Sequence, residues 1–190
     1  MRYAIGLVFV LVFGILFLSE VEGIEFEASV GLGWLEGDNI AGSETGSVLN
    51  VGASRTLVSG VDYFVHIQYA RISAEVDFTY VYRSGGLGVR WYPSRQRLVP
   101  YAMGRLGLYD WRIERGGETA RNPDTGEQMR TRSLGLGGGI GVLWRLSDRL
   151  SADLAVLSDF VFSQDPEIMG PEDENEVLLQ SRVGLRYRLF

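Results

Sequence analysis

The sequence predicts an all-β fold, an eight-stranded antiparallel up-and-down transmembrane β-barrel with a polar lumen. Three observations predict it. Apolar and polar residues alternate with a period of two along most of the chain after residue 23, as in strands with one apolar face. Polar, glycine-rich stretches and short turns separate these segments. The polar faces carry charges between glycines, and a barrel in lipid turns such faces inward.

Composition limits the classes of protein to which the chain can belong. The 190 residues are 46% hydrophobic and include 25 glycines, which is consistent with one domain. All basic residues are arginine, and the net charge of −6 gives no reason to expect a nucleic-acid partner. Because cysteine is absent, disulfides, thiolate metal sites and a lipid-modified N-terminal cysteine are excluded.

Residues 1–23 read as a signal peptide, which leaves 24–190 as the outer-membrane β-barrel domain. Arg2 gives a positive start, and the run from Ile5 to Leu18 is apolar apart from two glycines. As a helix this run would span about 21 Å, which is short of the roughly 30 Å hydrocarbon core of a bilayer. A cleavable export signal therefore fits better than a membrane helix.

The first three strands are predicted from strict alternation. The apolar face of the first strand carries Ile24, Phe26, Ala28, Val30, Leu32 and Trp34. Residues 36–46 are polar and glycine-rich and predict a loop. The next strand has Leu49, Val51 and Ala53 on its apolar face, and Ser59-Gly60 marks a turn. The third strand follows with Val61, Tyr63, Val65, Ile67 and Tyr69.

The fourth and fifth strands are less regular. Phe78, Tyr80 and Tyr82 share one parity, whereas Leu87, Val89 and Trp91 share the other. A β-bulge near residues 84–86 would reconcile the two sets. After the basic segment 93–100, a fifth strand is expected around 101–113, where Arg105 stands among Met103, Tyr109 and Trp111 and leaves the register ambiguous.

The last three strands alternate clearly again. Residues 114–130 predict a long polar loop, and the sixth strand follows with Leu134, Leu136, Ile140, Val142 and Trp144. Residues 147–149 turn the chain into a seventh strand with Leu150, Ala152, Leu154, Val156, Phe160 and Phe162. The acidic loop 163–176 precedes the final strand, whose apolar face holds Val183, Leu185, Tyr187 and Leu189.

The loops and the two strand faces predict how the barrel lies in the membrane. Long loops are expected after strands 1, 3, 5 and 7, outside the cell, with short turns and both termini on the periplasmic side. The inward face is predicted to hold a charge network in which acids and arginines pair across a narrow lumen. Its members are Glu25, Glu27, Asp62, His66, Arg90, Arg145, Asp153, Asp159, Arg182, Arg186 and Arg188.

Aromatic residues near the strand ends are expected to form the girdles of such a barrel, because an indole or phenol has an apolar body and a polar tip. They are Trp34, Trp91, Tyr92, Tyr101, Trp111, Trp144 and Tyr187. The alternative is a soluble eight-stranded barrel of the lipocalin type, which would require an apolar interior.

In these features the chain resembles the small outer-membrane β-barrel family of the OmpA transmembrane domain and OmpX. The resemblance covers about residues 24–190 and rests on GGLGVRWYP, VPYAMGRLGLY, GLGGGIGVLW and the terminal VGLRYRLF, in that order. It implies a location in the bacterial outer membrane, with the lipid bilayer and lipopolysaccharide as partners. It also implies insertion by the outer-membrane assembly machinery, for which Tyr187 and Phe190 would form the signal. Phe190 departs from the pattern because it is out of phase with Tyr187.

No catalytic, cofactor-binding or metal-binding residue is expected, and the chain is not expected to be an enzyme. Outer-membrane lipid A deacylases use a Ser/His/acid set, but nothing around His66, the only histidine, matches it. The glycine run 135–141 lacks the lysine and helix of a phosphate loop. The acids of 163–176 could bind divalent cations that bridge lipopolysaccharide phosphates, although a solvated loop is the simpler interpretation.

The function expected is a structural or surface-interaction role, with a lumen closed by the charged network. The loops 36–46, 114–130 and 163–176 are expected to meet lipopolysaccharide, host or matrix. Eight strands enclose room for side chains only, which disfavours a general porin. A narrow channel or transporter for small solutes is the alternative, and a lipid-modifying outer-membrane enzyme is a third hypothesis.

Overall fold

The computed structural model describes residues 23–36, 44–73, 78–94, 96–123, 125–162 and 176–189. The predicted signal peptide, apart from Gly23, lies outside these residues, as does Phe190. Within the described ranges no helix is long and apolar enough to cross a membrane.

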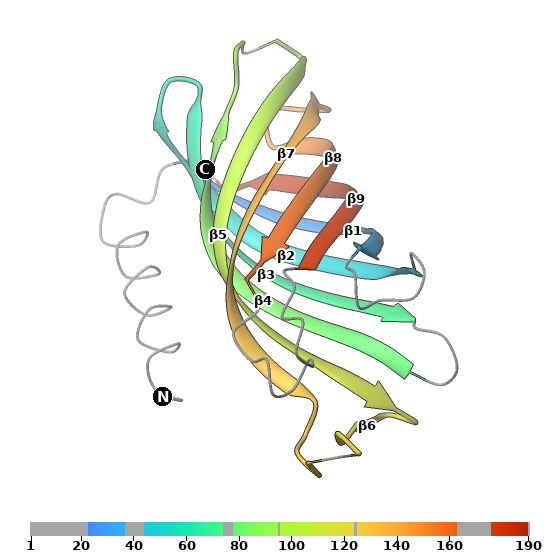
Figure 1. The fold of residues 1–190 in the computed structure, drawn as a ribbon. Coiled ribbons are helices and arrows are strands. Elements are labelled where there is room, and N and C mark those ends of the chain that lie inside the picture. The colour runs from blue at the N-terminus through green and yellow to red at the C-terminus, as the bar shows by residue number, and fades with distance from the viewer. Residues whose placement is uncertain are drawn as a thin grey trace.

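Within the described residues nine antiparallel strands make up one sheet, and eight of them close into a barrel (Figure 1). The strands are β1 (Ile24–Glu36), β2 (Glu44–Val58), β3 (Val61–Ser73), β4 (Phe78–Trp91), β5 (Leu98–Arg115), β6 (Glu118–Thr119), β7 (Arg130–Arg145), β8 (Leu150–Val161) and β9 (Glu176–Arg188). Each barrel strand pairs with the next along the chain, and β1 pairs with β9 to close the ring. The short β6 extends only the end of β5. The predicted fold class is confirmed.

Alternation along the strands divides the barrel into an apolar exterior and a mixed interior. The large apolar side chains of one parity are exposed on the outer wall, among them Val30, Leu49, Ile67, Leu87, Leu106, Leu136, Ile140, Leu154, Val156, Val183 and Leu185. In water this belt would be a severe liability, because soluble proteins rarely expose contiguous apolar patches of this extent. The belt therefore faces lipid, and the closed ring satisfies the backbone hydrogen bonds that lipid cannot.

The bulge expected near residues 84–86 does not exist. The pairing of β4 with β3 and with β5 keeps a constant register from end to end. Tyr82 and Trp111 instead lie inside the barrel, with their stacked ring centres 6.3 Å apart. Inward and outward residues therefore alternate without interruption along each strand, and no bulge is needed. The one register shift in this region of the sheet lies between Thr56 and Val58, beside the turn at Gly60, whose φ of 82° suits glycine.

The loops follow the predicted asymmetry except at one place. The connections β1–β2, β5–β7 and β8–β9 are the long ones, but only residues 74–77 separate β3 from β4. The expected long loop after the third strand is therefore wrong. The inward aromatic pattern that begins at Phe78 already belongs to β4, which pairs with β3 up to Ser73. The other three connections at this end still mark it as the extracellular one.

The interior is layered along the barrel axis. A cluster of buried apolar side chains in the periplasmic half centres on Phe64, Tyr101, Met103, Leu143 and Leu157. A second cluster in the extracellular half centres on Val48, Ile72, Tyr82, Trp111 and Leu178. Buried polar and charged side chains occupy the level between them and extend into the periplasmic half. The lumen is therefore less uniformly charged than the sequence indicated.

Candidate functional site in the barrel lumen

The centre of the lumen is held by an ion pair between Arg105 of β5 and Asp159 of β8. Both side chains are fully buried, and Arg105 Nε donates to Asp159 Oδ1 at 2.7 Å while its terminal nitrogen donates to Oδ2. Gln180 Nε2 donates to the same carboxylate at 2.6 Å, and Arg105 also donates to Gln68 at 3.0 Å. A carboxylate with three donors tolerates burial that an isolated one would not.

Gly137 of β7 makes this pair possible. In the strand register Arg105 lies opposite Gly137, which in turn lies opposite Asp159. The two side chains therefore meet across the strand that separates them. A Cβ on Gly137 would lie 2.0 Å from Asp159 Oδ1 and 2.9 Å from Arg105 Cγ. The ion pair occupies the space where a side chain of β7 would otherwise stand.

A second network lies toward the periplasmic end, around Arg186 of β9. Arg186 is paired with Asp153 and, at 3.5 Å, with Glu27, which also accepts from Arg90 at 2.9 Å. Tyr101 donates to Asp153 at 2.7 Å. Because these residues come from β1, β4, β5, β8 and β9, the network joins strands that are not neighbours in the sheet.

Aromatic rings surround this second network. The guanidinium of Arg90 lies 4.6 Å from the ring centre of Phe64 and 5.3 Å from that of Tyr101. Arg186 lies 5.2 Å from the Tyr101 ring and donates to the Tyr92 hydroxyl at 2.6 Å. Ring faces attract cations, so the arginines are stabilised by the same side chains that fill the lumen.

Two of the predicted network members lie in the lumen without a carboxylate partner within the described residues. Arg182 is buried and directs a terminal nitrogen to Met103 Sδ at 3.9 Å. His66 is buried beside Phe64, and in the described part of the chain neither ring nitrogen has a hydrogen-bond partner. Arg182 lines a small internal cavity together with Glu27, Asn50 and Asp153, so it lies beside the second network without an ion pair to it in the described part of the chain.

The remaining predicted members lie at the periplasmic mouth. Glu25 accepts from Arg188 at 2.5 Å, and Asp62 accepts from Thr56 at 2.8 Å. Arg145 lines a polar vestibule there of about 1020 Å³, together with Glu25, Asp62, Arg186 and Arg188. Apart from Arg186, these groups are solvated neighbours of the buried network and not parts of it.

Sequence reasoning missed Arg105, Gln68 and Gln180, which form the central layer with Asp159. The sequence does contain a pattern that places Arg105 inside, because it shares the parity of Tyr101, Met103 and Tyr109, which all lie inside the barrel. The assignment of Tyr101 and Trp111 to the outer girdle obscured this parity. The acidic loop 163–176 lies outside the described residues except for Glu176, which is buried and accepts from Tyr82 at 2.7 Å.

The aromatic girdle is smaller than predicted. Trp111, Tyr101 and Tyr92 are inside the barrel, with Trp111 only 1% exposed. Trp91 and Trp144 are exposed on the outer wall near the periplasmic ends of β4 and β7, and Tyr187 is exposed near the end of β9. Parity, rather than nearness to a strand end, decides which aromatic residue reaches lipid.

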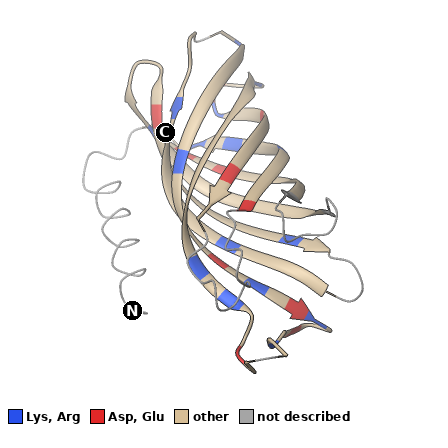
Figure 2. Cartoon of the chain, viewed as in Figure 1, with Lys and Arg blue, Asp and Glu red and all other residues tan. Residues whose placement is uncertain are grey.

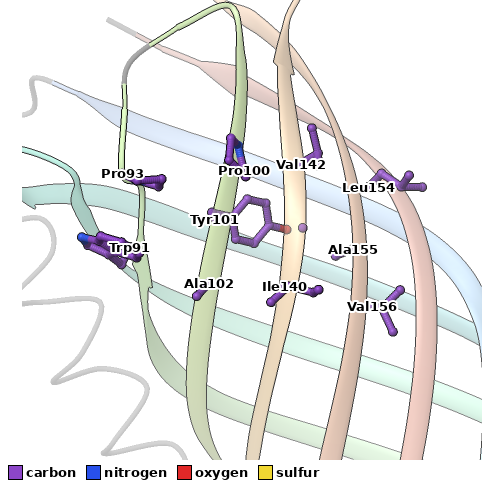
Figure 3. A pocket seen from close by; sticks show the side chains of 11 residues that line it. Trp91, Pro93, Pro100, Tyr101, Ala102, Ile140, Val142, Leu154, Ala155 and Val156 are labelled. Carbon is purple, nitrogen blue, oxygen red and sulfur yellow. The ribbon is translucent and has the colours of Figure 1, made fainter.

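The outer wall contains an apolar groove of about 430 Å³ over β5, β7 and β8 (Figure 3). Trp91 and Pro93 bound it on one side and Leu154 and Val156 on the other, with Ile140 between them. It lies in the apolar belt, where lipid acyl chains surround the barrel.

In the described part of the chain no group of three or more His, Cys, Asp or Glu residues is placed to hold a metal ion.

Comparisons with known proteins give matches only in structure. No protein-family profile matches the sequence, and no curated protein matches it significantly. Neisserial surface protein A is similar with a TM-score of 0.66 and 16% identity, over 88% of this chain and 98% of that chain. Ail, the attachment invasion locus protein of Yersinia pestis, gives 0.52 and 13%, over 87% and 99%. The outer-membrane enzyme PagL gives 0.50 and 11%, over 87% and 99%.

Identities this low relate folds, not activities. The fold is that of the small outer-membrane β-barrels, as the sequence resemblance implied. The closed barrel and its apolar belt, together with this fold, localise the chain to the lipid bilayer of the bacterial outer membrane.

Proposed function

We propose that the chain is a structural or surface-interaction protein of the outer membrane whose lumen is closed by its charged network. The observation that carries the proposal is the central layer, where Arg105, Asp159, Gln68 and Gln180 are all buried and hydrogen-bonded to one another. A solute crossing the barrel would have to break these bonds.

The layers on both sides of that centre support the same proposal. Tyr92, Tyr101 and Arg186 fill the periplasmic half, whereas Tyr82 and Trp111 stack in the extracellular half. An eight-stranded barrel is only wide enough for such side chains. A barrel filled in this way serves as a rigid anchor, and the extracellular loops then provide the surface available to partners.

Ion conductance in planar lipid bilayers tests the proposal. We expect no stable conductance step from the full chain, because the central layer blocks the lumen. A matched Arg105→Ala/Asp159→Ala variant removes the blocking side chains and should produce resolvable steps. Steady conductance from the wild-type protein would refute the closed lumen and favour the narrow channel instead.

The narrow channel has one observation in its favour. The polar vestibule of about 1020 Å³ opens at the periplasmic mouth and reaches Arg186. Among the described lumen side chains, buried donors such as Arg90 Nη1, Arg105 Nη1 and Gln68 Nε2 have no hydrogen-bond partner and would be satisfied by water.

The proposal includes no enzymatic activity. Nucleophilic catalysis needs a base hydrogen-bonded to its nucleophile, and His66 has no such partner among the described residues. Mass spectrometry of lipid A from cells with and without the protein tests this directly. A change in acylation would revive the lipid-modifying hypothesis.

Insertion by the outer-membrane assembly machinery through a C-terminal aromatic signal is also part of the proposal. Tyr187 supports it, because its side chain lies on the outer face of β9 together with Leu185. Pulse-chase assembly of Tyr187→Ala and Phe190→Ala chains tests it. Loss of the heat-modifiable, folded form in either variant would identify which aromatic residue the machinery reads, and unchanged assembly of both would exclude the signal.

A further inference from the structure

Among the strand residues whose side chains the structure describes, charged side chains on the outer wall of the barrel lie in only two places. Arg55 lies near the periplasmic end of β2. All the others gather at the extracellular ends of β3, β4, β5 and β7, and we call them the arginine patch: Arg71, Arg83, Asp110, Arg112, Glu114, Arg130 and Arg132. Figure 2 shows blue bands gathered in this part of the barrel, toward the end that carries β6.

The strand register brings the members of the patch together. Arg83 lies opposite Asp110, which lies opposite Arg132 on the next strand. Arg71 lies opposite Val81, Val81 lies opposite Arg112, and Arg112 lies opposite Arg130. Six of the seven charges therefore form two adjacent rows, one with charges on β4, β5 and β7 and the other with charges on β3, β5 and β7.

The patch begins where the apolar belt ends. On β5 every outward residue from Leu98 to Leu108 is apolar or glycine, and the next outward residue is Asp110. Eleven residues at about 3.3 Å each, tilted by about 40°, rise about 28 Å, which matches the hydrocarbon thickness of a bilayer. On β7 the same length from Leu134 to Trp144 leads to Arg132. The patch thus lies at the level of the outer-leaflet headgroups.

Positive charge is left over within the patch. Asp110 pairs with Arg130 at 2.5 Å and with Arg132 at 3.5 Å, and Glu114 pairs with Arg112 at 2.5 Å. Five arginines and two acids leave a net charge of +3. Arg71 and Arg83 are exposed, and no described carboxylate forms an ion pair with either. A chain with a formal charge of −6 therefore concentrates cations on one side of its wall.

We propose that the arginine patch binds the phosphate groups of the glycolipid in the outer leaflet. A guanidinium donates two parallel hydrogen bonds to a phosphate, and several of them on one wall match a lipid with more than one phosphate. A lipid fits better than a soluble anion because the patch lies on the wall, directly above exposed Leu108 and Leu134, which would contact the acyl chains. The inference rests on the proposed barrel in the outer membrane and adds the site and chemistry of its lipid contact.

Binding of purified bisphosphorylated lipid A to the full chain, folded in a sugar detergent without phosphate, tests the proposal. The variant is Arg71→Gln/Arg83→Gln/Arg132→Gln, which removes the leftover charge and keeps the ion pairs of Arg130 with Asp110 and Arg112 with Glu114. The matched control is Arg97→Gln/Arg121→Gln/Arg149→Gln, which removes the same charge at exposed positions elsewhere. We expect the dissociation constant to rise at least about tenfold in the variant and less than about twofold in the control.

Three outcomes would overturn the proposal. Equal weakening in both triple variants would mean that net charge alone attracts the lipid. Equal binding of dephosphorylated lipid A would mean that acyl chains are recognised, and competition by inorganic phosphate at equal concentration would mean that the anion need not be a lipid. Heat-modifiable mobility and bilayer conductance, measured on the same preparations, report the barrel and its closed lumen independently of lipid binding.

Discussion

Arg105 and Asp159 pair inside the barrel across a strand that contributes no side chain between them. The two residues are 54 positions apart in the chain and lie on β5 and β8. Gly137 of β7 lies between them in the register, so the ion pair rests on bare backbone. Glycines thus stand between the charged residues of the sequence because large lumen side chains lie over them.

Gly137→Ala should destabilise the barrel by roughly 1–3 kcal/mol, because the new methyl group would displace the Arg105 and Asp159 side chains. Gly138→Ala is the matched control. Gly138 is the neighbouring residue, and a Cβ there would meet only the Met103 carbonyl oxygen at 3.5 Å, an ordinary contact. Urea unfolding in lipid vesicles measures both. Equal stability of the two variants would contradict the close approach at Gly137.

Arg105→Met should cost about 3–5 kcal/mol, because Asp159 would remain buried with Gln180 as its donor. Adding Asp159→Asn removes the unpaired buried charge and should restore at least half of the lost unfolding free energy. The same urea titration compares the single and double variants. A double variant that is less stable than Arg105→Met would show that the pair is not the source of the cost.

Tyr82→Phe should destabilise the extracellular half by about 1–3 kcal/mol. The change removes the hydroxyl that donates to the buried Glu176 carboxylate and leaves the stacking on Trp111 in place. Tyr69→Phe, on the outer wall of β3, is the control and should change stability by less than about 0.5 kcal/mol. Thermal unfolding followed by tryptophan fluorescence distinguishes them, and equal effects would count against the hydrogen bond.

Brominated lipids should quench the fluorescence of Trp91 strongly and that of Trp111 weakly. Trp91 is 56% exposed on the outer wall, whereas Trp111 is inside the barrel. Single-tryptophan proteins, made by replacing the other three tryptophans with phenylalanine, allow each one to be measured alone. Strong quenching of Trp111 would mean that β5 has the opposite parity, and the position of Arg105 would then be wrong as well.

The strand number and the parity of most strands could be predicted from the sequence, because charges mark the inner face. On β1, Glu25 and Glu27 alternate with Phe26 and Ala28, and only one orientation keeps the acids out of lipid. The same argument holds for β9, where Arg182 and Arg186 mark the inside. The physical penalty for a charge in hydrocarbon makes the pattern unambiguous in both strands.

Parity failed as a guide on β4, where aromatic residues occur on both faces, and on β5, where Tyr101, Tyr109 and Trp111 all lie inside. Tyr82 and Trp111 suit a lumen as well as a membrane interface, because each combines an apolar ring with a polar group. The sequence alone therefore offered a bulge as the reconciliation, and the aromatics inside the barrel make it unnecessary.

Partners within the lumen could not be predicted, because they depend on how far the strands are staggered around the ring. Glu27 on β1 meets Arg90 on β4, although β2 and β3 lie between these strands along the sheet. Residues that meet across a narrow barrel are not register neighbours, and only the tilt and closure of the strands decide which of them coincide.

The pairing of β1 with β9 has a kinetic consequence. The other strand pairs of the barrel are hairpins of consecutive strands, but the Glu25 and Arg188 side chains meet across 163 positions of sequence. Closing this pairing therefore costs more chain entropy than forming any hairpin of the barrel. We therefore expect the pairing of β1 with β9 to be the rate-limiting step of barrel folding. A chain interrupted before β9 would retain two unpaired sheet edges that could pair with other chains.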